Sequence, residues 1–181
     1  TLRTLFPYTT LFRSFFLFPA TVALALPMYK KFTLFKQNAT PILIGIFSGA
    51  IVGFVSVVFL SKLFGFTDVL IVSLIPKSIT TPIGIVLSKQ LGGLPSITVV
   101  AIIITGIVGS ISGPFMYKIL RIKDKVAMGI AMGASSHALG TARAMEMGET
   151  EGAMSGLTMA ISGIVIVLLY PLLWKIFLKM F

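Results

Sequence analysis

Three long runs of apolar residues dominate the chain, and each is long enough to cross a lipid bilayer as a helix. A spanning helix needs about 20 mostly apolar residues. Proline stands just before or near the start of the first two, where a helix tolerates it best. The pattern predicts three transmembrane helices, at Ile42 to Leu60, Ile97 to Tyr117 and Gly152 to Trp174.

Two further apolar segments are interrupted by polar residues. In the first, Val69 to Ile75 runs into PKSITTP and resumes at Ile83 to Leu91; in the second, Val126 to Ala134 runs into SSHALGT and resumes at Ala142 to Met147. Non-helical backbone at membrane depth costs several kcal/mol per unpaired amide unless protein or trapped water satisfies it. The interruptions therefore predict two discontinuous helices, broken or re-entrant, that line a cavity.

The interrupted segments also suggest an internal repeat. A shift of 56 residues places Asp68 on Asp124, Thr80 on Ser136 and Gly84 on Gly140, and it lays the first long run on the second. Identities are few, but the order of elements is shared. Paired interruptions in two halves point to a transporter binding site. The expected fold is thus an all-α, polytopic transmembrane bundle with an internal repeat.

Composition narrows the class of protein. Charged residues make up 11% of the 181 residues, against about a quarter in soluble domains, and hydrophobic residues make up 56% with a mean hydropathy of +1.04. The net charge of +10 comes from short clusters between apolar runs, which is typical of topology-setting loops rather than of a nucleic-acid surface. With no Cys, one His and five acids, the sequence predicts no metal site and no cofactor.

Catalysis is not expected. The sequence has no nucleophile elbow, phosphate loop or HExxH motif, and Ser135 and Ser136 stand too close to His137 in the chain to act as a hydrolase pair.

Loop charge favours a re-entrant segment at residues 68–92, because the basic clusters 30–36, 118–125 and 175–179 then share one face. We expect that face to be cytoplasmic.

The interruptions carry groups suited to an anion. Thr81 is predicted to cap a half-helix with Pro82 as its first residue, and Thr141 is predicted to cap the half-helix 142–147. Each new helix N-terminus offers free N–H groups and about half a positive charge. Two of them facing one cavity would form an anion site.

Two cations strengthen this interpretation. Lys77 lies within the first interruption and Arg143 follows the second. Arg143 has two alternatives: its planar fork binds a carboxylate ligand, or it pairs with Glu146 at the i,i+3 spacing.

His137 could relay protons or simply satisfy stray backbone groups. Hydroxyls at Ser78, Thr80, Ser135 and Ser136 could bind substrate or a coupling cation, or satisfy the helix breaks. Glu149 and Glu151 are expected at the membrane interface.

The first residues do not look native. Thr4 to Ser14 read TLFPYTTLFRS, the in-frame translation of a sequencing-adaptor oligonucleotide. We therefore expect residues 1–14 to be an artefact and residues 15–181 to form a single transmembrane domain without its natural N-terminus. The segment from Phe15 to Tyr29 is either the stub of a cut helix or a third interrupted one.

Three stretches resemble the LrgB/CidB family: MGIAMGASSHALGTARAMEMGETEGAMSGL from Met128, PKSITTPIGIVLSKQLGG from Pro76 and PATVALALPMYK from Pro19. The resemblance covers residues 15–181. The family's polar signature falls on Lys77, Ser78, Thr80, Thr81, His137, Gly140, Thr141, Arg143 and Glu146.

The resemblance implies a multi-pass protein of the bacterial inner membrane. Family members are antiholin-like modulators of murein hydrolase activity and autolysis, and they act with a small holin-like partner of the LrgA/CidA type. The resemblance also implies transport of small monocarboxylates, such as pyruvate, glycolate or glycerate, with a proton or sodium ion as a candidate coupling ion. A non-transporting regulatory subunit is the alternative, and a homo-oligomer stays open in both cases.

Overall fold

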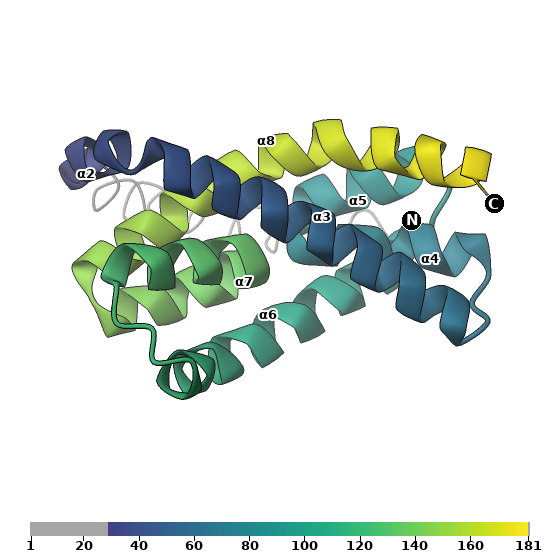
Figure 1. Cartoon of the computed structure of the whole chain (residues 1–181). Coiled ribbons are helices and arrows are strands. Elements are labelled where there is room, and N and C mark those ends of the chain that lie inside the picture. Colours follow the sequence, from purple (N-terminus) through teal and green to yellow (C-terminus); the bar gives the residue numbers. More distant parts are fainter. Residues whose placement is uncertain (1–28, 181) are drawn as a thin grey trace, which may run out of the picture.

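The computed structural model describes residues 29–180, and all regular structure in this part of the chain is helical (Figure 1). The expectations for residues 1–14 and for the segment up to residue 28 lie outside the described residues. The elements are α2 (Phe32–Gln37), α3 (Ala39–Leu63), α4 (Asp68–Leu74), the 3₁₀ turn η2 (Ile75–Ser78), α5 (Thr81–Gln90), α6 (Pro95–Ile119), α7 (Lys125–Met147) and α8 (Glu149–Met180).

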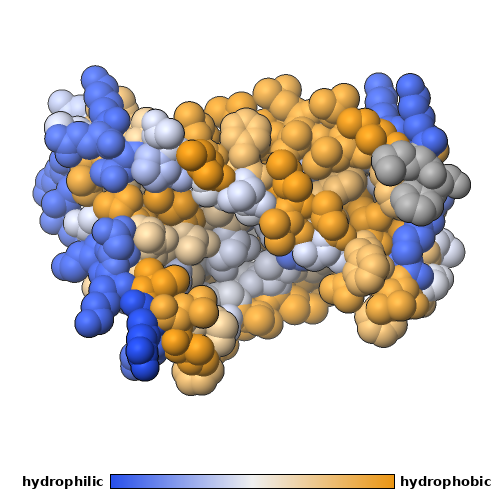
Figure 2. Space-filling view, in the orientation of Figure 1, coloured by the Kyte–Doolittle hydropathy of each residue, from blue (hydrophilic) through white to orange (hydrophobic). Residues whose placement is uncertain are grey.

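Three of these helices, α3, α6 and α8, are long and apolar enough to cross a membrane, and they coincide with the three predicted apolar runs. Large apolar side chains stay exposed along them, such as Val100, Ile104 and Ile111 on α6. Figure 2 shows an apolar middle with hydrophilic residues gathered at the two ends. A soluble protein would bury such a belt, whereas a bilayer covers it. The chain is therefore built as a membrane protein.

The first interrupted segment folds back at a short turn. Pro76 leaves helical geometry and Ile79 is extended, so that α4 ends and α5 begins in a new direction. At the end of this segment away from the turn, the Thr98 hydroxyl of α6 donates to the Ser73 carbonyl of α4 (2.8 Å). The same Oγ1 atom lies 2.7 Å from Ser88 Oγ of α5, so Thr98 holds α4 and α5 together. We call residues 68–90 the first hairpin.

The cap of α5 differs from the prediction by one residue. The helix begins at Thr81, its N-cap is Thr80, and Pro82 is the second helical residue rather than the first. Thr80 makes no side-chain capping bond. Its hydroxyl therefore stays available at the turn.

The second interrupted segment, α7, reverses direction at His137, where φ is 45° and ψ is −124°. Met132 and Ala144, which lie on opposite sides of His137, pack in one cluster. A Cβ on Gly140 would lie 2.6 Å from the Met132 carbonyl oxygen, which is impossible in a continuous helix. We call residues 125–147 the second hairpin, and both of its ends lie at one end of the molecule (Figure 1).

Two predictions fail at this hairpin. Its second half begins directly after His137, so Thr141 is not a cap but lies inside the helix, where it is buried. The 175–179 cluster also does not share a face with 30–36. The Lys62 ammonium lies 5.6 Å from the ring centroid of Phe177, whereas Lys31 lies 3.8 Å from Glu149 at the start of α8. The reason is that residues 126–147 return to the end from which they started instead of crossing.

Close helix contacts, rather than long side chains, position the second hairpin. A Cβ on Gly133 would lie 2.2 Å from the Ser155 carbonyl oxygen of α8, and one on Gly129 would lie 2.5 Å from that of Glu151. On the other side, a Cβ on Gly109 of α6 would lie 1.8 Å from Ser136 Oγ. The hairpin is therefore wedged between α6 and α8 at backbone distance.

Candidate functional site

The tips of the two hairpins meet in the apolar middle of the molecule. The Nε2 atom of His137 is hydrogen-bonded to the backbone carbonyl of Ser78. Because a carbonyl oxygen can only accept, Nε2 carries a proton; in the neutral ring, Nδ1 is then an acceptor. The ring is 4% exposed, and Nδ1 is buried without a hydrogen-bond partner. The contact joins residues 59 positions apart and brings the two interruptions together.

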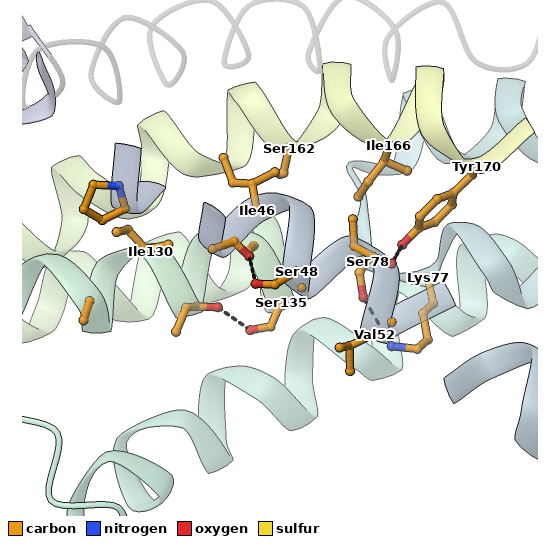
Figure 3. Close-up of a pocket in the computed structure, with 18 residues that line it drawn as sticks. Ile46, Ser48, Val52, Lys77, Ser78, Ile130, Ser135, Ser162, Ile166 and Tyr170 are labelled. Atoms are coloured by element: carbon orange, nitrogen blue, oxygen red, sulfur yellow. Dashed lines mark hydrogen bonds between the residues drawn. The ribbon is translucent and has the colours of Figure 1, made fainter. Parts of the chain in front are cut away.

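A cavity of about 550 Å³ lies on the α3 and α8 side of this contact. Figure 3 shows Ser162, Ile166 and Tyr170 of α8 along its wall, with Lys77 and Ser135 from the two hairpins. Its lining begins with Pro41 and Ala127, in the first turns of α3 and α7. The first cavity therefore extends from the end that carries the 30–36 and 118–125 clusters towards the hairpin tips.

A second cavity of about 550 Å³ lies on the α6 side of the contact. Both tips line it, together with Ile103, Gly106 and Ile107 of α6. Its wall includes the first residues of α5 and of the second half of α7, so two helix N-termini face one space. Lys77 and Ser135 line both cavities.

Lys77 is a cation without a counter-ion. Its ammonium donates to Ser78 Oγ at 3.2 Å. The ion pairs in the described residues are Lys31–Glu149, Lys62–Asp68 and Arg143–Glu146, and none of them includes Lys77. A charge at the middle of a membrane helix costs about 2.5–3.5 kcal/mol on insertion scales unless it is paired. The site thus has an excess positive charge.

The structure brings most of the predicted polar residues to this site. Ser135 donates to the Ala131 carbonyl (2.7 Å) and lies 3.0 Å from Ser136 Oγ. The predicted residues that line one or both cavities are Lys77, Ser78, Thr80, Thr81, Ser135, Ser136 and His137.

Four other predicted residues lie away from the cavities. Gly140 and Thr141 are buried behind the tip of the second hairpin. Arg143 pairs with Glu146 at 2.5 Å, and the two side chains are 45% and 65% exposed. This is the pairing alternative that the i,i+3 spacing allowed, and it places the guanidinium on the outer face of α7 beside Ser110 and Ile111 of α6.

Sequence reasoning missed the wall supplied by α3 and α8. Ser48, Ser162 and Tyr170 line the first cavity, and the Tyr170 hydroxyl donates to the Ala50 carbonyl at 3.2 Å. The signal in the sequence was the few hydroxyl residues that interrupt these two long apolar runs. Among residues 29–180, no group of His, Cys, Asp and Glu side chains could hold a metal ion.

Comparison with known proteins gives a consistent result. Residues 6–176 match the LrgB-like family. The chain is 43% identical to the uncharacterized protein YxaC of Bacillus subtilis (strain 168), over 81% of this chain and 64% of that protein. It is 35% identical to YwbG of the same strain, over 86% and 69%. It is 37% identical to the antiholin-like protein LrgB of Bacillus mycoides (strain KBAB4), over 88% and 69%.

The matched part of the chain therefore covers just under two thirds of the length of YxaC and slightly more of the other two proteins. No solved structure matches the chain.

Proposed function

The chain belongs to the LrgB-like family, and from this premise we propose that it carries small monocarboxylates of the pyruvate, glycolate or glycerate class across the bacterial inner membrane. The observation that supports this proposal best is Lys77, an ammonium without a counter-ion that lines both cavities at the meeting point of the hairpins. One carboxylate would balance its single charge. The neutral site would then no longer carry the cost of an unpaired charge.

The surrounding groups suit the same ligand. The helix N-termini at Thr81 and Ala138 add partial positive charge on the α6 side, and hydroxyls at Ser78, Thr80 and Thr81 offer hydrogen bonds to a carboxylate or to a hydroxyl on its neighbouring carbon. Arg143 is not part of this site in our proposal, because Glu146 already neutralises it.

We further propose a membrane arrangement of three spanning helices with two re-entrant hairpins that enter from opposite ends. These hairpins are the discontinuous helices of an internal repeat. The end with the 30–36 and 118–125 clusters is cytoplasmic under the positive-inside rule. Because Lys77 lines cavities on both sides of the tip contact, a small shift of the tips would expose the bound anion first to one cavity and then to the other.

A regulatory role is the second candidate. It is favoured by the name of the similar protein from B. mycoides, an antiholin-like protein, and by the exposed apolar face of α6. This face could bind a holin-like membrane partner, and through it the protein would act on murein hydrolase activity and autolysis. Regulation requires no ligand at Lys77, so the two functions can be separated experimentally.

The test is uptake of labelled pyruvate and glycolate by the full-length protein in liposomes. We expect saturable uptake that falls at least about tenfold in Lys77→Ala, the loss that corresponds to about 1.4 kcal/mol. Arg143→Ala, incorporated at the same level, serves as the matched cation control and should keep most of the activity. Equal uptake in wild type and Lys77→Ala would remove Lys77 from the path. The absence of uptake in every variant, with the holin-like partner present, would favour the regulatory role.

A further inference from the structure

Glu151, in the first turn of α8, is a buried carboxylate without a partner. The residue is 4% exposed, and its Oε2 atom has no hydrogen bond. The other four acids each have a hydrogen-bond or ion-pair partner: Asp68 has Lys62, Asp124 has the Ala127 amide, Glu146 has Arg143, and Glu149 has Lys31. Glu151 is expected at the membrane interface, and the structure shows that it is buried within the protein.

A capping role does not account for this burial. Glu151 stands three residues after Gly148, where a capping-box carboxylate would accept the backbone N–H of the residue before the helix. That N–H of Gly148 instead donates to the Ala144 carbonyl at 3.1 Å. Oε2 therefore lies close to Gly148 without receiving its proton.

No nearby charge compensates the carboxylate either. None of the described basic side chains forms an ion pair with Glu151, and two that lie at this end are already paired with other acids. The charged residues on the surrounding elements are Lys31 and Lys36 at α2, Lys125, Arg143 and Glu146 of α7, and Glu149 of α8.

Buried hydroxyls occupy one face of α8 between Glu151 and the candidate site. Ser155, Thr158 and Ser162 follow Glu151 on this face at spacings of four, three and four residues, and all three are at most 1% exposed. Ser155 Oγ lies 2.9 Å from Thr141 Oγ1, which is one helical turn from His137. At its far end, Ser162 lines the first cavity.

Three buried polar side-chain atoms of the described residues have no hydrogen-bond partner: two belong to Glu151 and Thr158 on this face of α8, and the third belongs to His137 at the tip of the second hairpin. They are Glu151 Oε2, Thr158 Oγ1 and His137 Nδ1. Buried polar groups are normally satisfied, so unpaired ones mark places where an additional proton, ion or water binds. Their distribution from the start of α8 to the hairpin tip points to a function for these groups together.

We propose that Glu151 binds the proton that drives carboxylate uptake, and that the buried hydroxyls of α8 join this proton site to the cavities; the inference rests on the proposed transport function. One proton neutralises the Glu151 carboxylate while one monocarboxylate neutralises Lys77, so the loaded protein carries no extra charge. The proton and the monocarboxylate are then both released on the other side of the membrane. Hydroxyls suit this path because each one donates and accepts. A sodium ion would need several oxygen ligands, and no group of three or more His, Cys, Asp or Glu side chains that could hold a metal ion is found among residues 29–180.

The experiment uses the full-length protein in sodium-free liposomes, with labelled pyruvate and an imposed inward proton gradient. Wild type should accumulate pyruvate several-fold above equilibrium, and a protonophore should abolish this accumulation. Glu151→Gln should lose the gradient-driven accumulation but exchange labelled for unlabelled pyruvate within about twofold of wild type, because exchange needs no net proton movement. Glu149→Gln, an exposed neighbour, is the matched control and should behave as wild type.

A second variant separates protonation from folding. Glu151→Asp keeps a carboxyl group and should retain part of the accumulation, whereas the Gln variant retains none. The inference is wrong if Glu151→Gln accumulates pyruvate as wild type does, if it loses exchange together with accumulation, or if sodium rather than protons drives uptake. Each of these outcomes contradicts the role of Glu151 while the wild-type protein still transports pyruvate. The absence of pyruvate flux in wild type would instead overturn the proposed function.

Discussion

Both hairpins reverse the direction of the chain, but different interactions hold them in place. The first is held by hydrogen bonds: Thr98, Ser73 and Ser88 form a buried hydroxyl cluster at its base, and its tip carries Lys77. The second is held by close backbone packing at Gly129 and Gly133, and its tip is a histidine in a conformation that L residues rarely adopt. The first hairpin therefore provides the charge, and the second provides a tightly fixed wall.

This difference indicates where variation should be tolerated. Hydrogen bonds at the base of the first hairpin can be lost one at a time, because each contributes a modest net stabilisation. A backbone contact cannot be partly lost, because any added atom must displace a whole helix. The following predictions compare the two hairpins directly, from the largest expected effect to the smallest.

The largest effect should come from Gly133→Ala. The new methyl would lie 2.2 Å from the Ser155 carbonyl oxygen, so α7 and α8 must separate, at a cost of about 3 kcal/mol or more. Gly49→Ala is the matched control in α3, since nothing lies within 4 Å of its Cβ position. That substitution should stabilise the helix by about 0.5–1 kcal/mol. Thermal unfolding in detergent measures both, and shifts of the same sign would contradict the packing account.

The first hairpin should be less sensitive. Thr98→Val keeps the shape of the side chain but removes the hydrogen bonds from Thr98 to the Ser73 carbonyl and to the Ser88 hydroxyl. We expect the free energy of unfolding to fall by about 1–2 kcal/mol. Ser110→Ala removes an exposed hydroxyl that bonds only within its own helix, and it should change stability by less than about 0.5 kcal/mol. The same unfolding assay compares them, and indistinguishable variants would argue against a structural role of the hydroxyl cluster.

The tip of the second hairpin separates backbone strain from side-chain bonding. His137 has the φ and ψ of the first central residue of a type II′ turn, which favours glycine. We expect His137→Gly to be more stable than His137→Ala by about 1 kcal/mol, although both lose the bond to Ser78. If the two variants unfold at the same temperature, the reversal at residue 137 carries no strain.

The smallest effect should come from Arg143→Ala. Its pair with Glu146 is exposed and of the i,i+3 type, which contributes about 0.3–0.5 kcal/mol. Its removal should scarcely change stability or pyruvate uptake. A loss of uptake comparable with that of Lys77→Ala would return Arg143 to the binding site.

The sequence predicted the elements better than their directions. Apolar runs identified α3, α6 and α8, because spanning helices need only length and hydropathy. The polar interruptions identified the residues of both tips. The sequence could not place Arg143, because the residue pattern was equally compatible with an ion pair to Glu146 at the i,i+3 spacing and with a position in the cavity.

The reversal of α7 was also beyond a pattern argument. A broken spanning helix and a hairpin have the same polar interruption, and only the position of the next helix distinguishes them. For the same reason the burial of Glu151 was missed: it depends on the close approach of α7 to α8 at Gly129 and Gly133, which no local signal reports.

The most direct test of the central claim, a carboxylate site between the hairpin tips, uses the absence of cysteine from the chain. Ser135→Cys adds one thiol to the lining of both cavities, and its alkylation rate can be measured with and without pyruvate against the full-length protein that lacks this substitution. We predict that pyruvate slows alkylation several-fold, that Lys77→Ala abolishes this protection, and that Ser110→Cys, outside both cavities, shows none. Alkylation of Ser135→Cys at an unchanged rate in saturating pyruvate would contradict the claim.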